Sequence, residues 1–467
     1  MVGVKDTRGR PLRDLRISVT DRCNMRCRYC MPREVFGSDF AFLSKIDILT
    51  YEEIDRLAGL FISLGVEKVR LSGGEPLLRK DLHELISMLA LRDVEIAMTT
   101  NGVLLPRYAP ALSAAGLDRV TVSLDALDEA TFAAITDSGH TVAAVLAGIE
   151  AAESVGLGPI KVNTVVKRGV NEDEILDLVK RFSSRDIATR FIEYMDVGTT
   201  NGWAMGEVVT ADEIRNIISE LQPLESQYHG EVAKRYRLPQ GGEVGLITSV
   251  TEPFCGDCTR ARLSADGHLY TCLFASQGLD LLTPMREGAS DEDLLALIET
   301  CWIAREDRYS EIRTEESPVR TRVEMSYIGG YSKQLSVTSS TTGQGASVRI
   351  AGAPHRATAA LKPASCKPAT NSIIFGGPPT SQYFGSISVM MRDGVSASPD
   401  SPTQCRTAVS ASFPQSSIAR PTVMVDSTSS SNNAPVQRGP EIRLSSRRIG
   451  CDNGNRQNGC SPSLPCG

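Results

Sequence analysis

The fold of this chain is decided by one stretch near its start, LRISVTDRCNMRCRYC at residues 15–30. Its first five residues alternate apolar and polar side chains, which predicts a β-strand. Three cysteines follow in the loop after that strand. From there, a short apolar strand followed by an amphipathic helix recurs about six times over the first 300 residues, which predicts a parallel sheet with helices outside, either open or curled into a full or partial barrel.

The expected elements follow each other closely along the chain. A helix begins after Thr50, because Glu53 stands three residues on and completes a capping box. A further helical stretch separates the fourth and fifth strands. Ligands of such folds bind at the carboxyl ends of the strands, so we expect the polar motifs to gather there. The other strands span 68–71, 94–98, 119–124, 160–166 and 189–193, and the helices span 51–64, 81–90, 106–115 and 172–182.

Composition narrows the class of protein. The 467 residues include 50 basic and 56 acidic side chains, a balance that predicts neither a nucleic-acid nor a membrane partner. No run of about 18 apolar residues occurs, so we expect no transmembrane helix. The polar start of the chain, with Asp6, resembles neither a secretory signal nor a mitochondrial presequence. We expect an intracellular protein, in the cytoplasm or the mitochondrial matrix.

The last part of the chain differs in composition. Residues 331–467 are rich in Ser, Thr, Pro and Gly and carry 13 basic and 5 acidic residues. They hold no long periodic segment that could bury a core and offset the entropy of ordering. The composition therefore predicts that residues 331–467 are disordered.

The first cysteine group has the spacing C-x3-C-x2-C and consists of Cys23, Cys27 and Cys30. Three thiolates can hold three irons of a [4Fe–4S] cluster, which leaves the fourth iron open for a small molecule. Basic side chains between the cysteines favour thiolates and an anionic cluster; these are Arg22, Arg26 and Arg28. A zinc knuckle or buried free thiols remain alternatives, although zinc needs a fourth ligand and the nearest histidine is His83.

With Tyr29 before its last cysteine, this spacing resembles the signature of the radical S-adenosylmethionine (SAM) superfamily. The resemblance implies that the open iron chelates the amino and carboxylate groups of SAM. It also implies that one electron from the cluster cleaves SAM to methionine and a 5′-deoxyadenosyl radical.

Three later strands end in polar residues. Ser72-Gly73-Gly74-Glu75-Pro76 follows the second strand, where paired glycines let the backbone approach a ligand and Glu75 offers a carboxylate to an ammonium group. By itself this pattern is typical of a turn, but one strand after the cysteine loop it resembles the superfamily's motif for the SAM amino group. Thr99–Gly102 ends the third strand and Ser123–Asp125 the fourth.

A second cysteine group lies near residue 260 and consists of Cys255, Cys258 and Cys272. It can hold a second [4Fe–4S] cluster with an open iron, or a zinc ribbon that includes His268. Arg260 and Arg262 lie on one side of an extended segment beside it. Two guanidinium groups next to an open iron suit an anionic, nitrogen-rich substrate such as a nucleoside triphosphate.

Together these motifs resemble the MoaA family of GTP 3′,8-cyclases. The resemblance rests on CxxxCxxC, CxxC-x-R-x-R, thirteen residues before the last cysteine, and Gly-Gly after Ser-Tyr-Ile, and it spans roughly residues 10–330. It implies an α/β fold, an incomplete (βα)6 barrel closed by a C-terminal region that carries the second cluster. The chain then divides into residues 1–230, 231–330 and the tail 331–467.

The resemblance also implies roles for single residues. The residues implied to contact GTP are Arg16, Arg70, Thr99, Lys161, Arg260 and Arg262. Those implied to contact SAM are Tyr29, Gly74, Glu75, Ser123 and Met195. Arg260, Arg262, Gly329 and Gly330 are implied to act in catalysis. Lys68 and Arg190 are further candidates for phosphate or proton handling, because an unpaired charge beside an apolar strand is costly.

The implied reaction is a radical cyclisation by a lyase that uses two [4Fe–4S] clusters and SAM. The deoxyadenosyl radical removes the ribose C3′ hydrogen of GTP, and the C3′ radical attacks C8 of guanine. Reduction then gives 3′,8-cyclo-GTP, the first step of molybdenum cofactor biosynthesis. The implied partners are GTP, a flavodoxin- or ferredoxin-type reductant, the cyclic pyranopterin monophosphate synthase that acts next, and a second copy in a homodimer.

The chain departs from the family at Gly329-Gly330, which ends the resembled enzymes and is followed here by 137 residues. In the family this end reaches into the active site. We hypothesise that the tail blocks that insertion and weakens cyclisation. A radical SAM enzyme acting on a peptide, and a cluster-binding isoform inactivated by its tail, remain alternatives.

Overall fold

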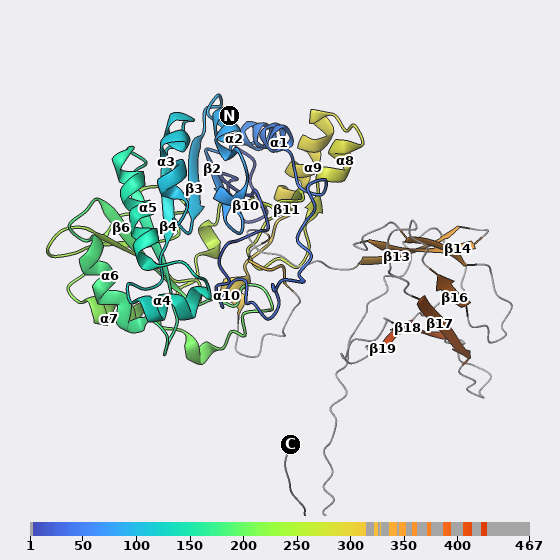
Figure 1. Cartoon of the computed structure of the whole chain (residues 1–467). Helices are drawn as coiled ribbons and strands as arrows, with labels where there is room; N and C mark the ends of the chain where they lie inside the picture. Colours follow the sequence, from blue (N-terminus) through green and yellow to red (C-terminus); the bar gives the residue numbers. More distant parts are fainter. Residues whose placement is uncertain are drawn as a thin grey trace, which may run out of the picture. The chain divides into compact units, whose positions relative to one another are not determined.

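The computed structural model describes residues 3–313, 322–325, 327 and seven strands beyond residue 335. The chain divides into two compact units, Met1–Ser332 and Lys333–Gly467 (Figure 1). Within the described residues, no helix has the length and apolar character needed to cross a membrane.

The first unit repeats strand and helix as the sequence predicts, and the capping box of Thr50 and Glu53 is confirmed. The strands are β1 (Asp14–Ser18), β2 (Lys68–Ser72), β3 (Glu95–Thr100), β4 (Arg119–Ser123), β5 (Ile160–Val166) and β6 (Ile187–Glu193). The helices are α1 (Tyr51–Ser63), α2 (Leu82–Leu89), α3 (Leu105–Ala114), α4 (Glu129–Thr136), α5 (Val142–Ser154), α6 (Ile175–Phe182) and α7 (Ala211–Ile218). The helical stretch expected between β4 and β5 consists of two helices, α4 and α5.

These strands belong to one 12-stranded sheet of order β12-β11-β10-β1-β2-β3-β4-β5-β6-β9-β8-β7. The strands from β10 to β9 run parallel, and an antiparallel hairpin extends each edge. The edge strands β12 and β7 do not pair, so the barrel is incomplete, as expected. The added strands are β7 (Gln222–Leu224), β8 (Lys234–Arg237), β9 (Glu243–Ile247), β10 (Arg260–Leu263), β11 (His268–Tyr270) and β12 (Leu279–Asp280).

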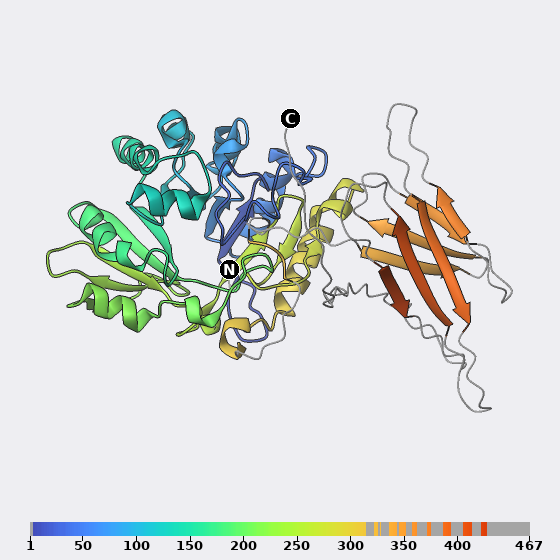
Figure 2. The ribbon, with the colours of Figure 1, turned by 60° about the horizontal axis from the view of Figure 1, so that its bottom comes forward.

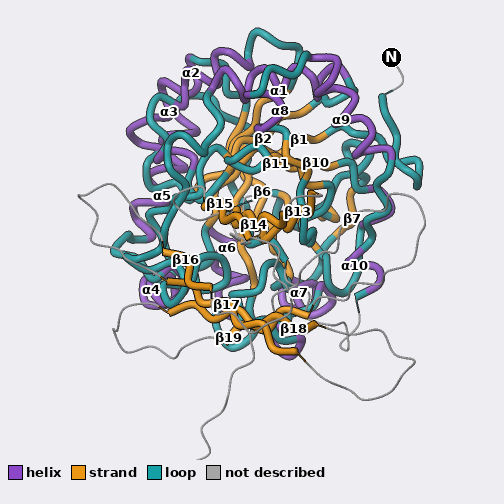
Figure 3. The backbone as a smooth tube through the Cα atoms, turned by 90° about the vertical axis from the view of Figure 1, so that its right-hand side faces the viewer, coloured by secondary structure: helices purple, strands orange, loops and turns teal. Residues whose placement is uncertain are grey.

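Helices cover the outer face of the sheet, where the apolar core lies (Figures 2 and 3). Every second residue of β1 faces this layer, and Leu15 and Ile17 are fully buried in it. Three helices complete the unit after β12, and α9 packs on α1. They are α8 (Leu282–Arg286), α9 (Asp291–Ile303) and α10 (Tyr309–Ile312).

The second unit holds a three-stranded sheet, β13-β14-β15, and a four-stranded sheet, β16-β17-β18-β19, both antiparallel. The composition argument does not anticipate these strands. That argument uses only the content of Ser, Thr, Pro and Gly. It does not consider short stretches in which apolar and small residues alternate, as at the start of SISVMMRD in β17. The strands are β13 (Ser336–Thr342), β14 (Gly345–Ala351), β15 (Ala357–Leu361), β16 (Asn371–Ile374), β17 (Ser386–Asp393), β18 (Cys405–Ser412) and β19 (Thr422–Asp426).

The contact between α5 and the turn before α3 gives a test of the packing. A Cβ atom on Gly148 would lie 2.1 Å from the carbonyl oxygen of Gly102. We expect Gly148→Ala to lower the free energy of unfolding by about 1–3 kcal/mol through this overlap, although alanine gains about 1 kcal/mol in helix propensity. Gly139→Ala is the control, because nothing lies within 4 Å of its Cβ position. Equal urea midpoints for both variants would contradict the packing described here.

Candidate functional site

The two cysteine groups lie at opposite ends of the barrel. The first follows the carboxyl end of β1. Cys255 and Cys258 directly precede β10, which runs parallel to β1, and Cys272 follows β11, which runs antiparallel to β10. The second group therefore lies at the amino end of β10. The expectation that the motifs gather at the carboxyl ends holds for the first group and is wrong for the second, because the direction of β10 depends on a pairing distant in sequence.

The inner face of the barrel carries charged side chains between these two ends. The strand register places Arg16 between Arg262 and Arg70. Farther along the sheet, Lys161 stands opposite Thr121. Parallel strands are ordinarily apolar on both faces. The charged side chains on this inner face therefore need a polar partner, which a hydrophobic core would not supply. The basic residues on this face are Arg16, Lys68, Arg70, Arg119, Lys161, Arg190, Arg260 and Arg262.

Burial and mutual repulsion lower the pKa of several of these side chains. Burial and the neighbouring Arg16 lower the pKa of Arg70 to about 10 and that of Arg262 to about 9. Burial, with Arg190 and other arginines, lowers the pKa of Lys161 to about 7. A bound polyanion would favour the charged forms and reverse these shifts.

Several polar atoms on this face have no hydrogen-bond partner within the described residues. Arg70 donates to Thr99 Oγ1 at 3.3 Å and to Thr121 Oγ1 at 3.2 Å. By contrast, Nε of Arg16 lies 3.9 Å from the nearest carboxylate oxygen of Asp14, and neither atom makes a hydrogen bond. Buried polar atoms are almost always paired, so the unsatisfied ones indicate where a ligand would supply the partners.

The Gly-Gly loop after β2 packs against the first cysteine loop. A Cβ on Gly74 would lie 2.3 Å from the carbonyl oxygen of Arg22, and one on Gly73 would lie 2.4 Å from that of Thr20. The amide of Gly74 donates to Thr20 O at 2.9 Å. The close backbone approach expected from the two glycines is thus made to the cysteine loop itself. Contact of Gly74 with SAM stays a prediction.

Glu75 is fully buried and accepts three hydrogen bonds from the chain. The donors are the amide of Leu77 at 3.0 Å, the hydroxyl of Thr100 at 2.8 Å and the amide of Asn101 at 2.8 Å. Burial raises the pKa of Glu75 to about 7 despite these bonds. Glu75 therefore joins the ends of β2 and β3 beside the cysteine loop.

Tyr29 reaches across to a residue that the sequence analysis placed only at a strand end. Its hydroxyl donates to Asp125 Oδ2 at 2.8 Å, and Asp125 Oδ1 accepts from the amide of Val165 at 2.8 Å. Burial raises the pKa of Asp125 to about 6. The carboxylate thus ties the cysteine loop to β4 and β5. Ser123 is the last residue of β4, and Met195 lies two residues after β6, where its carbonyl accepts from Asn201.

A second set of contacts holding the first loop was also missed from the sequence. Asn101 Nδ2 donates to Asn24 Oδ1 at 2.7 Å, and Asn24 Nδ2 lies 3.1 Å from His140 Nε2. The position of Asn24 within the cysteine loop and of Asn101 at a strand end was the available signal. No pattern in the sequence connects either residue to His140.

Arg26 braces the cysteine loop through the backbone. It donates to the carbonyls of Phe36 at 2.7 Å and of Cys23 at 2.8 Å. Burial raises the pKa of Cys23 to about 11 and that of Cys27 well above its ordinary value. The expected lowering of these pKa values by the interleaved arginines is therefore outweighed by burial, and iron binding must release the protons.

The second cysteine group has a more basic environment. Burial alone would raise the pKa of Cys258, but Arg260 and Arg305 lower it to about 6. Arg260 Nη2 donates to Cys258 Sγ at 3.1 Å, and Arg305 donates to the carbonyl of Cys258 at 2.7 Å. Arg10 donates to the carbonyl of Cys255 at 2.8 Å. The two bracing arginines, Arg10 and Arg305, had no motif to reveal them.

The six cysteines of the two groups are free thiols. Within the described part of the chain, no three or more His, Cys, Asp or Glu side chains are grouped so that they could hold one metal ion. None of these cysteines is in a disulfide.

The end of the first unit contacts the first cysteine loop. Residues 322–325 and 327, which we call the C-terminal strap, place Val323 and Tyr327 in an apolar cluster with Met31 and Phe36, on which Cys30 packs. Glu324 is buried and accepts from the Thr199 amide and hydroxyl, each at 2.7 Å. Gly329 and Gly330 lie outside the described residues.

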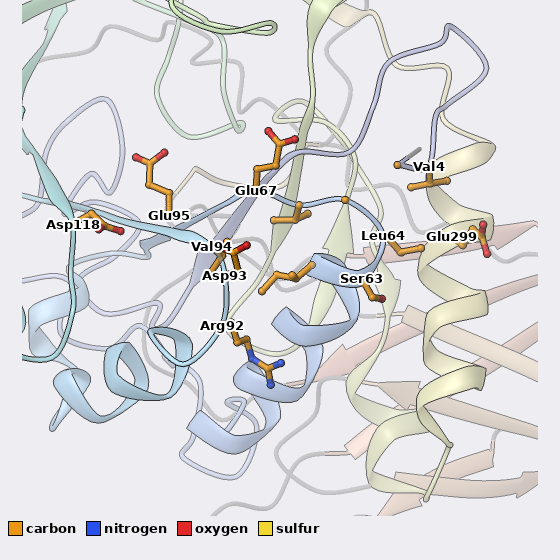
Figure 4. A pocket seen from close by; sticks show the side chains of 14 residues that line it. Val4, Ser63, Leu64, Glu67, Arg92, Asp93, Val94, Glu95, Asp118 and Glu299 are labelled. Carbon is orange, nitrogen blue, oxygen red and sulfur yellow. The ribbon is translucent and has the colours of Figure 1, made fainter. Parts of the chain in front are cut away.

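A cavity of about 840 Å³ lies at the amino ends of β2, β3 and β4 (Figure 4). Two of its acidic side chains already have partners: Glu67 pairs with Arg13 at 3.3 Å, and Asp118 accepts from the amide of Ile96 at 2.7 Å. It contains neither cysteine group. We therefore do not place the functional site there.

The contact between the two loops can be tested through iron content. We expect Gly74→Ala to push the cysteine loop away from β2 and so to lower the iron content after reconstitution. The loss should equal that of a variant in which Cys23, Cys27 and Cys30 are all changed to alanine. Gly139→Ala should retain all iron. Full iron content in Gly74→Ala would show that the close approach does not position the first group.

Comparisons with known proteins agree with this geometry. Residues 17–182 match the family model described as Radical SAM superfamily, and residues 187–311 match that described as Molybdenum Cofactor Synthesis C. The GTP 3′,8-cyclase of Acidothermus cellulolyticus is 52% identical over 358 residues, covering 70% of this chain and 99% of the relative. That of Staphylococcus carnosus is 47% identical over 339 residues, with the same coverage of both chains.

Among solved structures, SuiB of Streptococcus suis bound to S-adenosylmethionine is 14% identical, with a TM-score of 0.46 over 67% of this chain and 76% of that chain. A likeness at this level adds nothing to the argument. The two sequence relatives and the two family matches are sufficient: the chain belongs to the GTP 3′,8-cyclase family of radical SAM enzymes.

Proposed function

We propose that this chain converts GTP to 3′,8-cyclo-GTP, the first step of molybdenum cofactor biosynthesis. The observation that carries the proposal is the basic inner face of the barrel, which lies between the two cysteine groups. Arg16, Arg70 and Arg262 stand side by side there, with more positive than negative charge around them. A nucleoside triphosphate supplies both the missing negative charge and a base rich in nitrogen.

The first cysteine group fits a [4Fe–4S] cluster with SAM, as expected for the radical SAM family. When bound, these groups supply the radical that removes a hydrogen atom from the substrate. In our proposal the chain positions SAM at the carboxyl ends of the strands with five residues, and the buried network around Glu75 and Asp125 keeps those loops in place. These residues are Tyr29, Gly74, Glu75, Ser123 and Met195.

The second cysteine group holds a second [4Fe–4S] cluster in our proposal. Its support is chemical: Arg260 and Arg305 lower the pKa of Cys258 to about 6, so this thiolate forms readily, whereas burial raises the pKa of Cys272 to about 12. Arg260, which donates to Cys258, and Arg262 then stand between the cluster and the nucleotide. The open iron at this end would receive the guanine base.

The remaining basic residues bind the phosphates in this proposal. Arg16, Arg70 and Lys161 are held on rigid strands, so they keep their positions when the substrate enters. Thr99 fixes Arg70 by accepting its hydrogen bond. Enclosing the nucleotide on this face excludes water from the radical reaction.

The partners are proposed on the family resemblance. They are GTP as substrate, a flavodoxin- or ferredoxin-type reductant, the cyclic pyranopterin monophosphate synthase and a second copy of the chain. We also propose an intracellular location, for which bacterial relatives give no reason to choose the mitochondrial matrix. The division into residues 1–230, 231–330 and 331–467 belongs to the same proposal.

Gly329 and Gly330 come two residues after Tyr327 of the C-terminal strap, and residues 331–467 follow them in the sequence. We propose that the glycines act in the site and that the attached tail hinders them. We expect a chain ending at Gly330, given GTP, SAM and dithionite without oxygen, to form 5′-deoxyadenosine and 3′,8-cyclo-GTP, while the full chain forms little of either.

Three results decide the matter. Equal product from both forms would show that the tail does not hinder the site. Product from neither form, although both clusters assemble, would remove the assignment of GTP as substrate. Product from the shorter form alone supports both the substrate and the role of the tail.

The low pKa of Lys161 predicts proton uptake on binding. Burial first, then nearby arginines, lowers it to about 7 in the free chain, and bound phosphate raises it again. The complex then holds more protons than the free chain, so affinity is greatest below pH 7. It weakens as the pH rises above 7, by at most about tenfold per pH unit.

Calorimetry at pH 8 in buffers of different ionisation enthalpy measures this uptake. We expect up to one more proton to be taken up per GTP by the wild-type chain than by Lys161→Met, which cannot titrate. Because the γ-phosphate titrates in both proteins, the difference isolates the lysine. Equal uptake in the two proteins would place Lys161 away from the phosphates.

A further inference from the structure

The segment between β7 and β8 reaches the inner face of the barrel at three points. The ring of Tyr228 lies 4.2 Å from Nζ of Lys68 on β2. A Cβ on Gly230 would lie 2.7 Å from the carbonyl oxygen of Asp257, in the loop before β10. Glu231 Oε1 lies 3.7 Å from Nη2 of Arg190 on β6. We call residues 228–231 the crossbar.

Glu231 is a buried carboxylate that is held loosely. Its side chain is 1% exposed, and Oε2 accepts from the amide of Gln227 at 2.8 Å. Among the residues that the structure describes, Oε1 has no hydrogen-bond partner, and neither do Nε and Nη2 of Arg190. The pair is thus in Coulombic contact without the hydrogen bonds that make a buried ion pair strong.

Glu231 also acts on a second basic residue. Its charge raises the pKa of Lys161 against the lowering by burial and arginines, and Glu243 interacts with Lys161 as well. The other carboxylate near Arg190, Glu243, is already engaged by Arg235 through bonds of 3.0 and 2.6 Å. Glu231 therefore supplies negative charge where the proposed function places the phosphates.

We propose that Glu231 is a specificity-determining residue that selects nucleotides by their number of phosphates. The proposal rests on the proposed function and adds a selection step to it. Without substrate, Glu231 neutralises Arg190 and faces Lys161. The phosphates of the substrate displace this carboxylate and take its place.

The selection follows from the charge that each nucleotide brings. Every ligand must displace the carboxylate, and this cost lowers the apparent affinity. A triphosphate contacts several basic groups at once, and these interactions outweigh the cost of displacing the carboxylate. A monophosphate offers little more charge than the carboxylate that it replaces, so the internal anion discriminates against it.

The isosteric variant Glu231→Gln removes the charge and keeps the shape. In the full chain with reconstituted clusters, we expect GMP to bind about tenfold more tightly and GTP at most about threefold more tightly, within the usual range of coupling between sites. Anaerobic calorimetry measures the dissociation constant of GMP divided by that of GTP. That ratio should fall about threefold or more.

Two variants serve as matched controls. Glu252→Gln removes a carboxylate that pairs at 3.0 Å with Lys234, the first residue of β8. Because this pair does not include the crossbar, the variant should leave the ratio unchanged. Glu231→Asp keeps the charge and should stay close to wild type. If Glu231→Gln does not fold, Gly230→Ala offers a second route: its side chain would meet the loop before β10 and displace the crossbar, so the ratio should fall in the same direction.

The outcomes separate this inference from the proposed function. An unchanged ratio, or an equal weakening of both nucleotides, would overturn the selective role and leave Glu231 a structural residue. A wild-type chain that binds neither nucleotide would overturn both proposals. If the full chain binds GTP and discriminates against GMP, but neither it nor the chain ending at Gly330 forms cyclised product, the proposed function alone is overturned.

Discussion

The structure depends on like charges held side by side inside a parallel barrel. Arg16 stands in register between Arg262 and Arg70. Burial lowers the pKa of all three guanidinium groups. Repulsion between buried cations is strong where the dielectric constant is low. The fold can carry this cost because the outer face of each strand packs a large apolar core. A bound anion would relieve this cost, which supports the proposal that the inner face is a binding surface rather than a second core.

A cysteine group lies at each end of this face, and different contacts hold the two groups in place. The first depends on short loops locked together by buried polar residues, with Glu75 and Asp125 as their centres. The second lies at the amino end of β10 and is braced by Arg10 and Arg305, which come from far apart in the sequence. A nucleotide between the groups would meet SAM chemistry at one end and an open iron at the other. In our proposal, this arrangement lets one face recognise phosphates and base together.

Much of this could be predicted from the sequence, because local patterns encode it. Strand–helix alternation predicted the parallel sheet with outer helices, the family resemblance implied the incomplete barrel, and cysteine spacing predicted the two groups. The rest depends on long-range pairing that no local pattern encodes. The end at which the second group lies follows from the parallel pairing of β1 with β10, and the partner of Tyr29 follows from the meeting of distant loops. No motif in the sequence points to Glu231, since its burial arises only when the β7–β8 segment reaches the inner face.

The most direct test of the account is an anaerobic crystal structure of the reconstituted chain with GTP and SAM. The account predicts the nucleotide inside the barrel, with phosphate oxygens within hydrogen-bonding distance of Arg16, Arg70 and Lys161 and the base toward the second cysteine group. GTP bound in the cavity at the amino ends of β2, β3 and β4, or on the outer surface, would contradict it. The buried arginines would then need another explanation.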